Sequence, residues 1–212
     1  RVLAVGFNRR FAPMMRDVQA HIAAVPGPIT ATFRVSAGHL DADHWTNDLE
    51  QGGGRLLGEG CHFIDTLRYL VGHQIETVSA VAHSGPNVPA QARDCLLMNL
   101  TFVDGSIGQV TYVSQGSPKV AKERLEVFGD GGRSAIMDNY RSLTLYTGSK
   151  IKKTTSKSPD KGHQAEVSAF LSAVRGDTEP VPVSEIANVS YATLAAVRSL
   201  ETGGTVRLMQ VE

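Results

Sequence analysis

Apolar residues recur along this chain with two periods, and the change between them divides it. In most of the first 72 residues, and again after residue 162, they return every three to four positions, which is the period of a helix with one buried face. Between these regions they return at every second position, as in a strand. The helical period predicts four helices, which lie within Pro13–Ala24, Gly52–Gly72, His163–Arg175 and Ser184–Thr202.

Closely spaced strand-like stretches make up the middle of the chain. Turn sequences rich in glycine, aspartate and asparagine separate them, and such short connections favour antiparallel neighbours. The stretches predicted as strands are Ile29–Ala37, Ile75–His83, Asp94–Phe102, Ile107–Val113, Glu123–Phe128, Ser134–Met137 and Ser142–Tyr146. The basic, apolar-poor segment Lys150–Gly162 fits either a mobile loop or an edge strand.

The two faces of the predicted strand Asp94–Phe102 differ little in polarity. In a sheet with one face in water, that face would carry more charge. One face carries Leu96 and further apolar residues at alternate positions, while the other carries Leu97 and Asn99 and no charge. We therefore expect a single α+β domain over residues 1–212, with a large, mostly antiparallel open sheet of about six strands and helices on one face. A second copy would cover the other face, in a homodimer or a tetramer of such dimers, burying on the order of 1,600 Å² or more.

Composition excludes several classes of protein. The chain has 212 residues, with 21 basic and 21 acidic side chains, so its charge does not indicate binding to nucleic acid or to a membrane surface. No apolar run approaches the roughly 20 residues that span a bilayer, and no secretory signal opens the sequence. Cys61 and Cys95 lack the spacing of a disulfide framework or zinc site, which favours free thiols in a cytoplasmic protein.

The start of the chain suggests either processing or a fragment of a longer protein. There is no initiator methionine, and Arg1–Val5 is predicted to be a short buried strand. Asn8 and Arg9 would then lie at the carboxyl end of a strand, where α/β proteins bind ligands, although a solvated basic pair before a helix explains the arginines as well.

The stretch Gly52–Gly72 carries the most informative polar residues. Its apolar side chains fall on one arc of a helix, and His62 lies near the centre of the opposite arc. Glu59 and Asp65 stand three positions before and after His62, so each is expected to be its neighbour on the helix surface. The residues placed on this polar arc are Arg55, Glu59, His62, Asp65, Thr66 and Tyr69.

The loop before this helix holds other candidates. His39, His44 and His62 lie close in sequence, but their spacing matches no metal-ligand motif, and we predict no metal site. Trp45, the only tryptophan, fits a packing residue beside the helix or a wall of a ligand pocket.

The pattern GGGxLLxxGCHxIDxxRYLxG resembles the signature helix of the C-terminal domain of the Gfo/Idh/MocA oxidoreductases. The segments VGFNRRF, FVDGSIGQV and FGDGGRSAIMD and the two closing helices extend the resemblance over nearly the whole chain. The sequence of this helix is most similar to that of a subset of bidomain oxidoreductases, in which this unit follows an alcohol-dehydrogenase-like half.

The resemblance implies a fold and an activity. Members of the family join an N-terminal Rossmann domain to a C-terminal α+β domain and transfer hydride between NAD or NADP and a sugar, cyclitol or related secondary alcohol. The glycine fingerprint and the Glu-Lys-Pro motif of that Rossmann domain do not occur here. Residues 1–7 therefore look like the last strand of a missing Rossmann domain, which would bind most of the cofactor, and we expect the fragment alone to be catalytically incompetent and to bind NAD(P) weakly.

The resemblance also assigns roles within the central helix. His62 matches the family histidine that exchanges a proton with the substrate hydroxyl, a task that suits an imidazole near neutral pH. The family aspartate four residues before it is replaced by Gly58, so Glu59 beside it, or Asp65, is the candidate partner. We expect substrate contacts from Asn8, Arg9, His44, Trp45 and Asp65. Two alternatives stay open: His62 could merely bond a neighbouring backbone group, and the chain could be a stand-alone ligand-binding or dimerisation module without redox activity.

Overall fold

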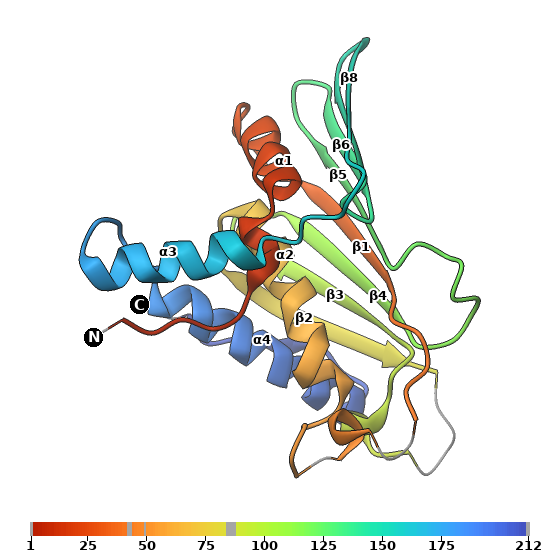
Figure 1. Cartoon of the computed structure of the whole chain (residues 1–212). Coiled ribbons are helices and arrows are strands. Elements are labelled where there is room, and N and C mark those ends of the chain that lie inside the picture. The colour runs from red at the N-terminus through yellow and green to blue at the C-terminus, as the bar shows by residue number, and fades with distance from the viewer. Residues whose placement is uncertain (1, 42–43, 49, 84–87, 211–212) are drawn as a thin grey trace.

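The protein is an α+β domain built on one open sheet, with helices gathered on one side (Figure 1). The computed structural model describes residues 2–41, 44–48, 50–83 and 88–210. Its strands are β1 Thr30–Ser36, β2 Ile75–Ala82, β3 Leu96–Phe102, β4 Ile107–Val113, β5 Glu123–Gly129, β6 Arg133–Asp138, β7 Ser142–Thr147, β8 Lys150–Thr155 and β9 Val206–Arg207. They lie in the order β8-β7-β6-β5-β1-β4-β3-β2-β9, and the pairing of β1 with β4 is parallel while all other pairs are antiparallel.

The predicted fold class is confirmed, but the sheet is larger than the expected six strands. The start of the segment Lys150–Gly162 forms edge strand β8, which was one of its two interpretations. Strand β9 was not predicted, because only Thr77 and Val78 pair with it and two residues are too few to show a period. Among the described residues the sheet therefore has nine strands.

Four α-helices accompany the sheet, close to where the helical period placed them. They are α1 Pro13–Ala23, α2 Cys61–Val71, α3 His163–Arg175 and α4 Val183–Thr202. Short helical turns join them: the 3₁₀ turns η1 Asn8–Phe11, η2 Trp45–Asn47 and η4 Ala90–Ala92, and the π-helical turn η3 Leu56–Gly60. None of the described helices is both long and apolar enough to cross a membrane. The cytoplasmic location stays a prediction.

The core lies between the sheet and its helices. Strand β3 alternates strictly, so that Leu96, Met98 and their alternate neighbours are buried while Leu97 and Asn99 are exposed. The opposite side of the sheet, which we call the open face, is covered by nothing in the described chain. Its exposed apolar side chains are Val81, Leu97, Ile107, Phe128 and Ile151. Apolar side chains are exposed on this face as expected, but charged ones such as Arg124 and Glu126 lie on it too, and its burial by a second copy stays a prediction.

The N-terminal segment departs from its prediction. Arg1 lies outside the described residues, and residues 2–7 form no strand. Leu3 and Val5, predicted to be buried, are 54% and 42% exposed. A strand needs a neighbour to accept and donate its backbone hydrogen bonds, and among the described residues no strand lies beside this segment.

Helix α3 also differs from an ordinary core helix. Of its residues, only Ala173 is buried. Its apolar stripe is largely exposed, although Phe170 also lines a small cavity beside the N-terminal segment, and the exposed side chains are Val167, Phe170, Leu171 and Val174. The period of the stripe was predicted correctly, but the surface that it covers is not among the described residues.

Candidate functional site

The central helix begins with an irregular turn that carries Glu59. The π-helical turn η3 leads directly into α2, which ends at Gly72 with a left-handed backbone (φ +77°). Tight packing explains Gly52, since a Cβ there would lie 2.5 Å from the carbonyl oxygen of Trp45, while Gly53 and Gly54 have left-handed backbones (φ +67° and +85°). π-turns are rare within α-helices, and those that occur are often found at functional sites.

The polar arc of this helix is not the open surface that the sequence predicted. Asp65 and Thr66 are fully buried, because η1 and α4 pack over that side of α2. The Asp65 carboxylate accepts hydrogen bonds from Nε of Arg10 at 3.1 Å and from its Nη2, and Nη1 of Arg10 donates to Glu185 at 2.9 Å. Asp65 therefore ties η1 to α2 and α4, and its expected place on an exposed face is wrong.

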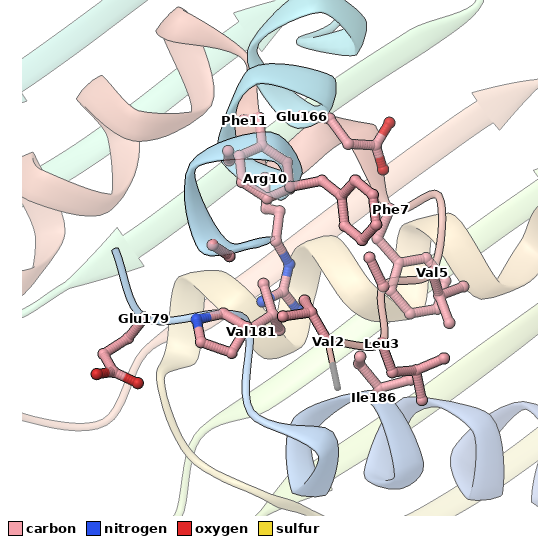
Figure 2. A pocket seen from close by; sticks show the side chains of 15 residues that line it. Val2, Leu3, Val5, Phe7, Arg10, Phe11, Glu166, Glu179, Val181 and Ile186 are labelled. Atoms are coloured by element: carbon pink, nitrogen blue, oxygen red, sulfur yellow. The ribbon is translucent and has the colours of Figure 1, made fainter. Parts of the chain in front are cut away.

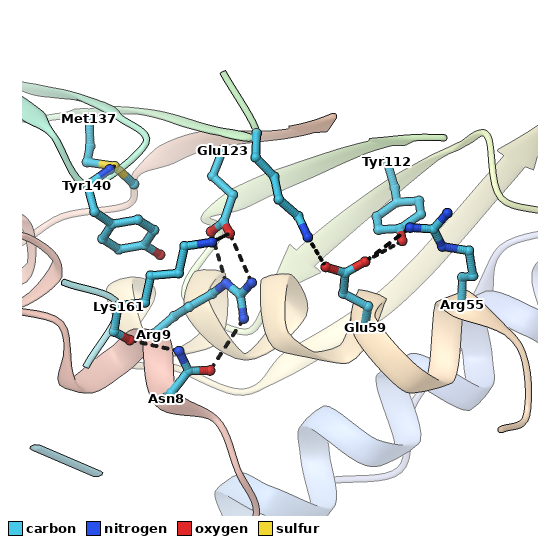
Figure 3. Close-up of polar contacts among 10 residues, drawn as sticks. Asn8, Arg9, Arg55, Glu59, Tyr112, Glu123, Met137, Tyr140 and Lys161 are labelled. Carbon is cyan, nitrogen blue, oxygen red and sulfur yellow. Dashed lines mark hydrogen bonds and ion pairs between the residues drawn. The ribbon is translucent and has the colours of Figure 1, made fainter. Parts of the chain in front are cut away.

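Glu59 binds three neighbours, none of which is His62. Its carboxylate accepts hydrogen bonds from the Tyr112 hydroxyl at 2.5 Å and from Nζ of Lys122 at 2.7 Å, and Nη2 of Arg55 lies 3.5 Å away (Figure 3). Burial alone would raise the pKa of Glu59, but the bonds from Lys122 and Tyr112 outweigh it and hold the pKa below its usual value. Glu59 is thus a carboxylate fixed in place. No hydrogen bond between described residues joins it to His62.

His62 is half-buried between the N-terminal segment and the ion pairs of the core. Its ring meets Phe7 edge to face, with ring centroids 5.9 Å apart. Burial, together with the positive charge of Arg9, lowers the pKa of His62 to about 4, so the ring is neutral at pH 7. The buried Nδ1 atom has no hydrogen-bond partner among the described residues. A buried ring nitrogen without a partner is costly, and such an atom is a sign of a functional role.

Asn8 and Arg9 belong to a buried network centred on Glu123 (Figure 3). Arg9 donates from Nε and Nη2 to the two carboxylate oxygens of Glu123, at 2.9 and 3.0 Å, and its guanidinium stacks 4.6 Å above the ring of Phe63. Nζ of Lys161 donates to the same carboxylate at 2.6 Å, and Asn8 joins Arg9 to the backbone of Lys161. Arg9 is therefore no solvated residue, since its charge is paired and lies beside His62.

His44 and Trp45 lie in a separate loop. Nδ1 of His44 accepts from the backbone N–H of Thr46 at 3.3 Å and lies 2.8 Å from its hydroxyl, which caps η2. Trp45 is 60% exposed, so its interpretation as a packing residue is wrong. Its role as the wall of a ligand site stays a prediction.

Four further residues of this region were not predicted from the sequence: Tyr112, Lys122, Glu123 and Lys161. They come from strands and loops far from the central helix in sequence. A signal existed only for Glu123, which alternates with Leu125 and Val127 and so occupies an inward position of a buried strand. A carboxylate at such a position needs a cationic partner, and that requirement could have linked it to Arg9.

Two hollows flank the site. One, of about 1050 Å³, opens where β1 and β4 end, and Ser36, Ser114, Lys122 and Asn139 are among its lining residues. Ligands in α/β proteins commonly bind at the carboxyl ends of parallel strands, and β1 and β4 are the parallel pair of this sheet. The other is a small apolar cavity of about 70 Å³ between the N-terminal segment, α3 and the start of α4 (Figure 2). Within the described chain, no three His, Cys, Asp or Glu side chains lie close enough to hold a metal ion.

These features define an open-sheet α+β domain whose helical side carries a half-buried histidine among ion pairs. The chain belongs to the family described as GFO/IDH/MocA C-terminal domain, whose pattern matches residues 27–135. It is similar to a 1,5-anhydro-D-fructose reductase of Ensifer adhaerens, with 26% identity over 159 residues, covering 73% of this chain and 47% of that protein.

Solved structures share the fold at low sequence identity. The aldose-aldose oxidoreductase of Caulobacter crescentus, complexed with glycerol, superposes with a TM-score of 0.81 at 20% identity, over 98% of this chain and 64% of that one. GenD2 from gentamicin A biosynthesis, in complex with NAD, superposes with a TM-score of 0.72 at 22% identity, over 98% and 64%. The chain spans less than half the length of the curated relatives that it matches and about two thirds of these solved chains.

Proposed function

We propose that this chain is the substrate-binding and oligomerisation part of an NAD(P)-dependent oxidoreductase that acts on a sugar, cyclitol or related secondary alcohol. His62 is the proton acceptor. The observation that carries this proposal is a histidine that burial and Arg9 keep neutral and whose buried Nδ1 has no hydrogen-bond partner among the described residues. The activities for which two relatives are named, 1,5-anhydro-D-fructose reductase and aldose-aldose oxidoreductase, support the substrate class.

The chemistry needs a neutral base beside the alcohol. Oxidation of a secondary alcohol removes a hydride from carbon and a proton from oxygen, and the carbonyl forms as both leave. A neutral imidazole nitrogen accepts the hydroxyl proton, and the resulting imidazolium is stabilised by nearby carboxylates. Glu59 and Glu123 both act on His62 in this sense, because each favours its charged form.

The remaining residues divide into supporting and contacting groups. Glu59 is a positioning residue, since its bonds to Lys122 and Tyr112 keep it ionised rather than ready to exchange a proton. Asn8, Arg9 and Asp65 hold η1 against α2 and β5. His44 and Trp45 contact the substrate from the loop before the helix.

NAD or NADP, when bound, supplies the hydride acceptor. The sequence has no glycine-rich phosphate loop, so a preceding Rossmann domain in the longer protein would hold the cofactor. The exposed apolar residues of α3 and of the N-terminal segment support a docking surface for that domain, because such side chains are usually covered. The residues of this surface are Leu3, Val5, Val167, Phe170, Leu171 and Val174.

The open face supports assembly into a homodimer, or a tetramer built from such dimers. On this face Thr30 of β1 lies between Phe128 and Ile107, which are 48% and 51% exposed. An apolar row in the middle of an uncovered sheet fits burial against its own copy by two-fold symmetry.

The test is His62→Ala in the longer enzyme that contains this domain. We expect turnover to fall by about 10²-fold or more while the thermal midpoint changes little, because loss of a general base costs 10²–10⁴-fold. His21→Ala is the matched control, since that histidine lies on α1 against the backbone of Tyr146. Unchanged turnover in His62→Ala would remove the proposed role and favour the second candidate, a ligand-binding module without redox activity.

A further inference from the structure

The ionised side chains around His62 do not balance. Two carboxylates, Glu59 and Glu123, are each shared by two cations. The cations are Arg9, Arg55, Lys122 and Lys161. Two positive charges are therefore in excess, although the whole chain has equal numbers of basic and acidic residues.

The excess charge lies on groups that can still bind a ligand. Among the described residues, Nζ of Lys122 and Nζ of Lys161 each donate one hydrogen bond, at 2.7 and 2.6 Å, whereas an ammonium has three donors. Their side chains are 40% and 23% exposed, while that of Glu123 is fully buried. The Glu123 carboxylate thus faces inward, the Glu59 side chain is 22% exposed, and the spare N–H groups of the two lysines reach solvent.

Such an excess favours an anion. Positive charges withdrawn from bulk water lose hydration, and an anionic ligand that binds between them restores the balance. Arg9 and His62 lie within electrostatic range of both Glu59 and Glu123, so the two ion-pair clusters act on one region. The hollow of about 1050 Å³ is large enough for a sugar-sized molecule, and of these residues Lys122 lines it, whereas Lys161 and His62 do not.

We propose that the substrate of this site is an anionic sugar or polyol, whose carboxylate or phosphate binds Lys122 and Lys161 while its hydroxyl faces His62. This inference rests on the proposed function, because it names the substrate class of the same site. Ammonium groups bind either anion as point charges.

The experiment follows the imidazole signals of His62 by NMR in this chain, assigned by comparison with His62→Gln. The ligands are gluconate, glucose 6-phosphate and the uncharged sorbitol, each titrated at low salt because screening weakens charge pairs. We expect gluconate or glucose 6-phosphate to bind at least fivefold more tightly than sorbitol and to raise the pKa of His62. Which of the two anions binds more tightly identifies the charged group.

Lysine variants locate the effect. Lys122→Gln and Lys161→Gln should each reduce the preference for the anion over sorbitol by about threefold or more, while Lys153→Gln on the edge strand β8 should leave it unchanged. Equal binding of sorbitol, no response of His62 to either anion, or a preference that survives both lysine changes would overturn the proposal. Turnover of the His62→Ala enzyme is independent of this preference, so a failure here is distinct from a failure of the proposed function.

Discussion

Replacing Glu123 by glutamine tests the buried network beneath the site. Glu123 is fully buried and Arg9 is 6% exposed, so Glu123→Gln leaves a guanidinium without its bidentate partner in the core. Breaking a buried pair by removing one member costs about 3–5 kcal/mol. For a domain of this size 1 kcal/mol corresponds to roughly 2–4 °C, so the thermal midpoint should fall by about 6–20 °C.

Thermal and urea unfolding followed by circular dichroism measure this cost. Glu201→Gln is the matched control, because the same substitution there removes a surface ion pair to Arg198 at 3.2 Å and should cost less than about 1 kcal/mol. The double variant Arg9→Met with Glu123→Met should recover at least half of the loss, since buried pairs are often replaceable by apolar residues. A loss below about 1 kcal/mol in Glu123→Gln would show that the pair does not hold η1 to β5.

Three further outcomes follow from the structure. The pKa of His62 in the folded protein, about 4, lies below its ordinary value of about 6.5, so its contribution to stability is complete above pH 6.5 and is lost as pH falls towards 4. His62→Gln should therefore flatten the dependence of the thermal midpoint on pH between these values. An unchanged slope would contradict the assignment. The double variant Leu97→Lys with Phe128→Lys should be a monomer in light scattering, whereas Val174→Lys on α3 should stay a dimer. Identical masses for all variants would exclude the open face as the interface. NADH fluorescence titrated with this chain should show no sub-micromolar binding, because no phosphate-cradling loop is present.

The sheet could be predicted because its signal is local. The alternation of apolar residues within the seven residues of β3 indicates its buried face, and the helix His163–Arg175 was predicted with its observed bounds. The prediction was wrong where a segment needs a partner to pair with or to cover. Residues 2–5 have the composition of a buried strand but no neighbour to pair with in the described chain, and the stripe of α3 has no surface to cover.

The site was predicted in part. His62 was found from its place on the helix, but the neighbours assigned to it were derived from a regular helix. Glu59 lies in a π-turn instead, and its carboxylate accepts hydrogen bonds from Tyr112 and Lys122 rather than from His62. Asp65 is buried by Arg10, which stands 55 positions earlier. Contacts over such separations are set by tertiary packing, which a period of three or four residues does not encode.

The parallel pair of strands has a consequence for the order in which the domain can fold. Thr30 and Ile107 pair although they stand 77 positions apart, whereas β5, β6, β7 and β8 join through short turns. Closing so long a loop costs entropy before any contact repays it, and pairings of high sequence separation slow folding. The central helix lies inside that loop, whereas Lys122 and Glu123, at the start of β5, lie beyond it. We therefore expect the meander to form from local contacts, and the environment of His62 to be assembled only when the last, long-range pairing closes.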